Sequence, residues 1–249
     1  MPLTIAHPAA VLPFRQGRFP MSALVIGSMA PDFEYVLHLS PRSDFSHTAL
    51  GLFAFCLPAG LIALWIFHRI WVPPIVAMLG REHSHRARPF PFWPIGRLAI
   101  LCGEILIGAL THLIWDSFTQ DYGWLVQRMD GLSRTVMLVG SVEVPLYLVL
   151  QHASSLLGIA VLLFAVFYHH KWTWPAFSGH WPLLAVIGWL TIAGGVALGM
   201  LAAGDVSTTQ GLMRWPGCGL VIAATVFFLV TTFLCVMWHI RRFLAHLAL

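Results

Sequence analysis

The chain has 249 residues, of which 58% are hydrophobic and 10% are charged, and its formal net charge is +4. Soluble globular domains carry about 25% charged residues, so this composition and a mean hydropathy of +0.79 exclude an ordinary soluble protein. The pI of 9.2 does not indicate nucleic-acid binding, because the bases are scattered arginines beside apolar runs, as in the loops of membrane proteins.

The N-terminal segment, residues 1 to 20, lacks the basic start, apolar core and small-residue cleavage site of a signal peptide. We therefore expect this segment to be retained and available for function. Residues 21 to 38 form a shorter apolar piece that Pro31 interrupts. This pattern predicts a small helix followed by a second helix that starts at Pro31.

Longer stretches meet the requirement of about 20 mostly apolar residues for a membrane span. They cover residues 48 to 68, 98 to 118, 142 to 168, 181 to 203 and 217 to 239. Ser46 is a candidate N-cap for the first of them and Thr48 a helix-start residue. The third is longer than a bare span needs, so its first turns either project beyond the bilayer or form an interfacial or re-entrant region.

The predicted fold is all-α: a polytopic helical membrane protein of about five transmembrane helices plus short N-terminal helices, in a single membrane domain of residues 1–249. Arginines and lysines in short loops predict its orientation. Eight lie on the side that we assign to the cytoplasm: Arg69, Arg81, Arg86, Arg88, Arg97, Lys171, Arg241 and Arg242. The other side has six bases diluted by acidic residues, and we assign it to the exterior.

Histidines and carboxylates gather on this predicted outer side. His112 and Asp116, in THLIWDSFT, stand four positions apart at the end of the second span, so both lie on one face of a helix. An isolated carboxylate near the bilayer costs a few kcal/mol and normally pairs, faces a cavity or binds a ligand. The candidate metal ligands are His7, Asp32, His47, His112, Asp116 and His152.

These residue types suit zinc, with manganese or iron as alternatives. Asp32 or Asp116 could bridge two ions, so the residues leave one or two ions open. A bound metal supplies hydroxide at neutral pH for hydrolysis, and Asp44 or Glu34 is the candidate proton acceptor. The simpler interpretation of any lone histidine here is a hydrogen bond to a neighbour.

The segments HPAAVLP, GSMAPDFEY, FSHTALGLF, THLIWDSFT and QHASSLLG, in this order, resemble the bacterial membrane family catalogued as domain of unknown function 4184. That family is similar to membrane-bound metal-dependent hydrolases of the LexA-regulated type. A more distant similarity is to zinc-dependent phospholipase C and single-strand-specific zinc nucleases, which implies a polynuclear metal site for phosphate esters. Leu156 stands where the zinc phospholipases carry a further ligand, and Gln120 stands where members of the membrane family often carry a histidine. A mononuclear or inactive site is therefore the alternative.

The resulting hypothesis is a metal-dependent phosphoesterase of the bacterial inner membrane that acts on a lipid or lipid-linked phosphate at the outer face. Residues 1–180 would hold the metal-site core, and residues 181–249 would add two transmembrane helices. The alternatives are a haem-binding electron-transfer protein with His112 and His152 as ligands, and an ion or metal transporter. The oligomeric state stays open.

Overall fold

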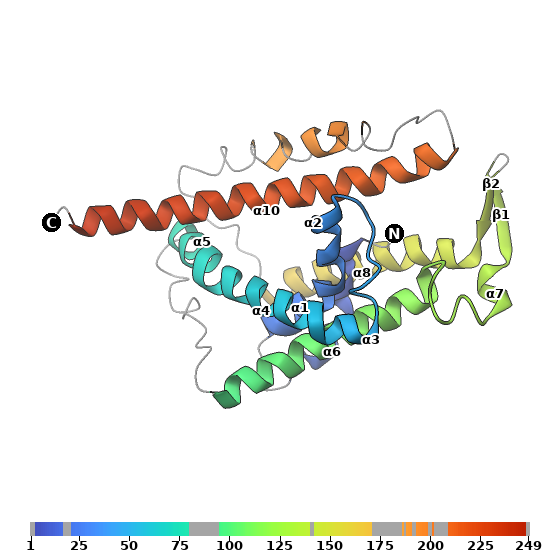
Figure 1. Ribbon diagram of the computed structural model, residues 1–249, viewed down its shortest axis with the longest axis horizontal. Coiled ribbons are helices and arrows are strands. Elements are labelled where there is room, and N and C mark those ends of the chain that lie inside the picture. Colours follow the sequence, from blue (N-terminus) through green and yellow to red (C-terminus); the bar gives the residue numbers. More distant parts are fainter. Residues whose placement is uncertain are drawn as a thin grey trace. The chain divides into compact units, whose positions relative to one another are not determined.

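The computed structural model describes residues 3–16, 21–79, 95–139, 142–170, 186, 188–190, 193–198, 201 and 209–247. These residues are mostly helical and include a two-stranded hairpin (Figure 1). The chain divides into two compact units, which we describe separately. Unit 1 comprises Met1–Glu34, Ser43–Leu61 and Trp93–Thr173, and unit 2 comprises Tyr35–Arg42, Ile62–Phe92 and Trp174–Leu249.

Four helices among the described residues are long and apolar enough to cross a membrane. They are Ala49–Ala77, Gly96–Thr119, Leu146–Tyr168 and Gly217–Leu247. The predicted all-α membrane class is therefore confirmed, together with four of the five expected spans. The remaining expected span, 181 to 203, lies only in part within the described residues.

The first span is built from consecutive helical segments. They are α3 (Ala49–Gly51), the π-helical η3 (Leu52–Cys56), α4 (Leu57–Ile66), the π-helical η4 (Phe67–Trp71) and α5 (Val72–Leu79). Its N-cap is Thr48, whose Oγ1 accepts a hydrogen bond from the N–H of Gly51 at 2.9 Å. The expectation that Ser46 caps this span is therefore wrong, because Ser46 is fully buried and its Oγ contacts His47 Nδ1.

The third span starts later than its apolar run. Residues Val142–Pro145 form strand β2, which pairs antiparallel with β1 (Thr135–Val139), and helix α8 (Leu146–His170) begins directly after Pro145. The extra length is thus the second strand of a hairpin that leads into the helix. The short helix α7 (Asp130–Ser133) comes before this hairpin. Figure 1 shows the hairpin leading directly into α8.

The N-terminal segments of unit 1 are short helices, as expected. They are the 3-10 helix η1 (Thr4–Gln16), α1 (Met21–Met29) and the 3-10 helix η2 (Ala30–Phe33), which α2 (Glu34–His38) follows. Pro31 lies in the first turn of η2, where its missing N–H costs nothing. The proline ends α1 and places Asp32 on the next turn.

Unit 1 is held together by close packing of α1 against α6 (Ile95–Thr119). A methyl group added at Gly108 would clash with the carbonyl oxygen of Leu24 and lie 2.6 Å from the backbone nitrogen of Ser28, and one at Gly27 would clash with the backbone of Ile105. Glycines at these two positions let the two backbones approach directly, as small residues do between membrane helices.

In unit 2, α10 (Thr209–Leu247) contacts η4. The indole Nε1 of Trp71 donates a hydrogen bond to Thr232 Oγ1 at 3.0 Å, and its ring lies 5.4 Å from that of Phe228. None of the candidate ligands belongs to this unit.

We expect Gly108→Ala to lower the free energy of unfolding by about 2 kcal/mol, because the new methyl group must force α1 away from α6. The matched control is Gly103→Ala on the same helix, where an added methyl group meets nothing within 4 Å. Unfolding of the purified protein in mixed detergent micelles measures both. Equal stability of the two variants would contradict the role of the close approach.

Candidate metal centre

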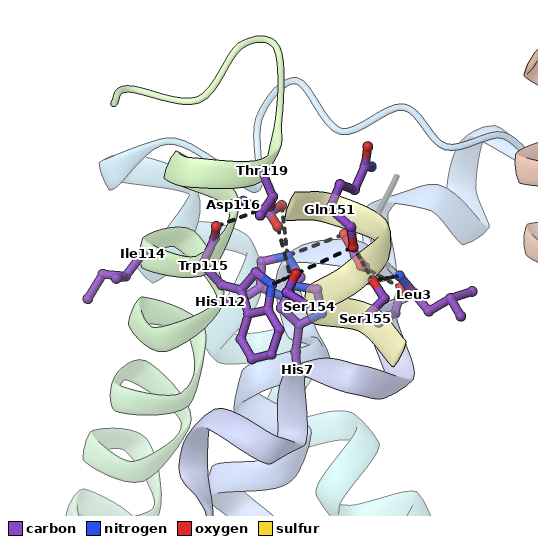
Figure 2. Close-up of polar contacts among 12 residues, drawn as sticks. Leu3, His7, His112, Ile114, Trp115, Asp116, Thr119, Gln151, Ser154 and Ser155 are labelled. Atoms are coloured by element: carbon purple, nitrogen blue, oxygen red, sulfur yellow. Dashed lines mark hydrogen bonds and ion pairs between the residues drawn. The ribbon is translucent and has the colours of Figure 1, made fainter. Parts of the chain in front are cut away.

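Five ionisable side chains from four segments of unit 1 meet at the end of α6. His7 comes from η1, Asp32 from η2, His47 from the loop before α3, and His112 and Asp116 from α6. All are buried except His47, whose side chain is 9% exposed. Figure 2 shows His7, His112 and Asp116 drawn together from η1 and α6.

The ligand-type atoms lie close to one another. His112 Nε2 is 3.3 Å from Asp116 Oδ2 and 3.5 Å from Asp32 Oδ1. His47 Nε2 is 3.4 Å from Asp116 Oδ2 and 3.9 Å from Asp32 Oδ1. Two overlapping groups have the spacing of metal ligands: His47, His112 and Asp116, and His7, Asp32 and His112.

A backbone carbonyl sets the orientation of His112. Its Nδ1 lies 2.8 Å from the carbonyl oxygen of Ser28. Because a carbonyl only accepts, Nδ1 carries the proton and donates it, so the lone pair of the neutral ring is on Nε2. Metal-binding histidines are characteristically fixed in this way by a second partner.

The loop that carries His47 is held by Glu34. A carboxylate oxygen of Glu34 accepts hydrogen bonds from the backbone N–H groups of Ser46 at 2.7 Å and Phe45 at 3.2 Å. Burial acts to raise the pKa of Glu34, but these hydrogen bonds outweigh it and lower the pKa, so the group is ionised at neutral pH. Ser46 Oγ in turn contacts His47 Nδ1 at 3.1 Å, which leaves Nε2 turned toward the carboxylates.

Asp32 and Asp116 each use one oxygen on a neighbour and keep one for the centre. Thr4 donates a hydrogen bond to Asp32 Oδ2, and His7 Nε2 contacts Asp116 Oδ1 at 3.3 Å. Burial acts to raise the pKa of Asp32, but the positive charge of a protonated His112 lowers the pKa below its usual value. Asp32 is therefore a carboxylate at neutral pH.

Five buried atoms of these residues lack a hydrogen-bond partner. Four of them are Asp32 Oδ1, Asp116 Oδ2, His47 Nε2 and His112 Nε2, and the fifth is His7 Nδ1. Buried polar atoms are nearly always paired, so these carboxylate and imidazole atoms require either protons on the imidazoles or a cation between them. The first four atoms belong to the two overlapping groups that share His112, and each group fits one cation.

Two of the expected residues lie apart from this cluster. His152 is exposed on α8 and belongs to neither group of ligand atoms, and Asp44 is exposed in the loop before α3. The residue of α8 that is buried beside His152 is Gln151. Glu34, the other expected proton acceptor, directs a carboxylate oxygen to backbone N–H groups.

The supporting residues Thr4, Ser28 and Ser46 were not expected from the sequence. Ser28 acts through its backbone carbonyl, which carries no residue-specific signal. Thr4 reaches Asp32 across 28 positions. The small or polar residues Gln151, Ser155 and Gly158 do recur at helical spacing on α8, and this pattern could have indicated its buried face.

We expect Glu34→Ala to lower the free energy of unfolding by about 2–3 kcal/mol, because it leaves buried N–H groups of the loop without an acceptor. Asp44→Ala, in the same loop but exposed, should change it by less than about 0.5 kcal/mol. Denaturation in mixed micelles at neutral pH measures both. Similar losses would show that Glu34 does not hold the loop.

Comparison with protein-family models matches residues 1–244 to the family described as "Domain of unknown function (DUF4184)". No match is found among curated proteins or among solved structures.

Proposed function

Since the chain belongs to the DUF4184 family, whose description assigns no chemistry, we propose from its own side chains that it is a membrane-bound metal-dependent hydrolase. The proposed substrate is a phosphoester or diphosphate of a lipid or lipid-linked molecule. One observation carries the proposal: four buried ligand atoms of His47, His112, Asp32 and Asp116 converge without hydrogen-bond partners.

The spacing within each group of ligand atoms supports a small cation. Zinc lies about 2.0–2.1 Å from histidine nitrogen and carboxylate oxygen, which separates the ligands of a tetrahedral site by about 3.3 Å. The four separations given above run from 3.3 to 3.9 Å. Two nitrogens and two oxygens suit zinc, and manganese or iron would also accept them.

We propose one ion rather than two. Both groups of ligand atoms contain His112, whose Nδ1 is engaged by Ser28 and whose Nε2 offers a single lone pair. The two groups therefore compete for one nitrogen. His7, whose Nε2 contacts Asp116, would then support a ligand rather than hold a second ion.

A divalent ion held here would polarise a phosphoryl oxygen and lower the pKa of a bound water. The chain's own residues supply the rest of the arrangement. Asp32 and Asp116 offset the ion's charge, while Glu34 and Ser28 keep the two ligating imidazoles in place. Asp44 remains the candidate proton acceptor because its carboxylate is exposed near this loop.

The surroundings of the site support a lipid-borne substrate. The segment between α6 and α8 exposes large apolar side chains, including Trp124 at 61% and Leu138 at 67%. Arg128 lies over the Trp124 ring at 4.3 Å, and tryptophan and arginine are typical of the membrane–water interface. A headgroup at this depth would lie near the end of α6, where His112 and Asp116 are.

The arginine distribution supports an external site in the bacterial inner membrane. Arg81, Arg86 and Arg88 fall between the first two spans in the sequence, and Arg97 lies at the start of the second span, at the opposite end of α6 from the site. By the positive-inside rule that end faces the cytoplasm. The haem alternative loses its basis, because His152 is exposed and His112 faces two carboxylates.

We expect detergent-purified protein to carry one divalent ion per chain, measured by elemental analysis. His112→Ala should lose it, because the substitution removes the ligand common to both groups. His152→Ala, which removes an exposed histidine, should retain the full content. Metal retained in His112→Ala would refute the centre, and metal lost in His152→Ala would return that residue to the ligand set.

Activity is tested with protein reconstituted in vesicles that contain phosphatidic acid or a lipid diphosphate. Phosphate release should require zinc or manganese, and Asp116→Asn should reduce the initial rate by at least about 100-fold, since it weakens a ligand directly. Removal of the metal by a chelator should stop the reaction and re-addition should restore it. Metal-loaded protein that hydrolyses none of these lipids would contradict the proposed substrate class.

A further inference from the structure

Two buried glutamines of unit 1 have amide groups without partners. Gln120 is 6% exposed and Gln151 is 2% exposed, and the Nε2 atom of each lacks a hydrogen-bond acceptor among the residues that the structure describes. A buried carboxamide that leaves N–H groups unpaired costs about 1–3 kcal/mol. Two such groups in one unit indicate that something outside the protein supplies the acceptors.

Gln120 continues the stripe of α6 that forms the metal centre. It follows Asp116 by four positions, and its backbone N–H donates to the Asp116 carbonyl at 3.0 Å, so the helical spacing persists to this residue. His112, Asp116 and Gln120 therefore succeed one another along one face of the helix. Gln120 lies one turn farther out than the ligands.

Gln151 approaches the same end of the centre from α8. The backbone carbonyl of Gln151 accepts a hydrogen bond from Ser155 Oγ, which itself accepts one from the N–H of Leu3. Leu3 directly precedes Thr4, the residue that donates a hydrogen bond to Asp32. Trp115 Nε1 donates to Ser154 Oγ at 3.1 Å and ties α8 to α6 just before Asp116. In Figure 2 the side chain of Gln151 points away from His7 and His112, toward the side on which Thr119 lies.

Tyr122 lies at the outer edge of this region. Its ring is 47% exposed and packs edge-on against the ring of His47, with centroids 6.0 Å apart. The ring thus lies between the buried centre and the exterior. A group that enters past Tyr122 would therefore meet His47 first.

We propose that Gln120 and Gln151 bind the non-bridging oxygens of a phosphate group whose remaining charge the metal neutralises. This inference rests on the proposed function and names the part of the substrate that the site recognises. The unpaired atoms are N–H donors, so they require a ligand that offers acceptors, as phosphate oxygens do. No arginine or lysine is buried in the described part of the chain, so neutral amides would do what cationic side chains do in other phosphate sites.

The test measures binding of inorganic phosphate to zinc-loaded, detergent-purified protein by titration calorimetry. Gln120→Leu and Gln151→Leu should each weaken phosphate binding about tenfold, since each removes a hydrogen bond to a charged oxygen. Gln127→Leu makes the same change at an exposed glutamine between α6 and α8 and should leave binding unchanged. All three variants should keep one zinc per chain.

Should a leucine variant fail to fold, Gln120→Glu and Gln151→Glu keep the side-chain size and replace the donor with a carboxylate, and they should weaken phosphate binding at least as much. Unchanged phosphate affinity with zinc retained would show that the carboxamides hold buried water only, and would overturn the inference while leaving the metal centre intact. Absence of zinc from the wild type would instead refute the proposed function itself.

A second arm compares a short-chain soluble phosphatidic acid with glycerol phosphate as competitors. Tighter binding of the lipid identifies a headgroup as the source of the phosphate, whereas equal binding identifies a free phosphate compound. Failure of both to compete with inorganic phosphate would overturn the inference.

Discussion

The direct contact between α1 and α6 is the constraint on which the site depends. Gly27 and Gly108 let two backbones meet where any larger side chain would separate them. The contact brings the carbonyl of Ser28 to His112 Nδ1 and so fixes the tautomer and direction of that ring. It also sets the position of η2, which follows α1 without a linker and carries Asp32. A shift between these two helices would move two ligands relative to each other.

The chemistry follows from placing several potential metal ligands in a small buried volume. Two carboxylates and two imidazoles lie within 3.3 to 3.9 Å of each other as carboxylate–imidazole pairs, and in the described part of the chain only protons or a cation can offset the charge of the carboxylates. Burying such groups without compensation costs several kcal/mol. A divalent ion would repay that cost on binding, so metal affinity and stability of unit 1 would rise together.

Around the ligands lies a layer of residues that act by orientation. Thr4 holds Asp32, Glu34 holds the loop of His47, and His7 contacts Asp116. Thr4 and His7 contact the carboxylate oxygen that faces away from the centre, and Glu34 binds the backbone next to His47. The ligand atoms are thereby aimed before any ion arrives, which reduces the conformational entropy lost on binding.

The sequence by itself determined the membrane class and most spans, because hydropathy over about 20 residues is a local property. It also determined the pairing of His112 with Asp116, because spacing of four fixes a common helix face. It did not determine that residues Val142–Pro145 form a strand, because their apolar run is continuous with the helix that follows. Hairpin pairing with β1 decided that.

Only the tertiary structure distinguished the neighbours Gln151 and His152. One step along a helix turns the side chain by about 100°, and which direction is buried depends on where η1 packs against α8. The same holds for Glu34 and Ser46, whose hydrogen-bond partners are set by how the chain returns to form the loop before α3. Local pattern thus identified the helices and the residue types of the centre, whereas packing between distant segments decided which side chains face it.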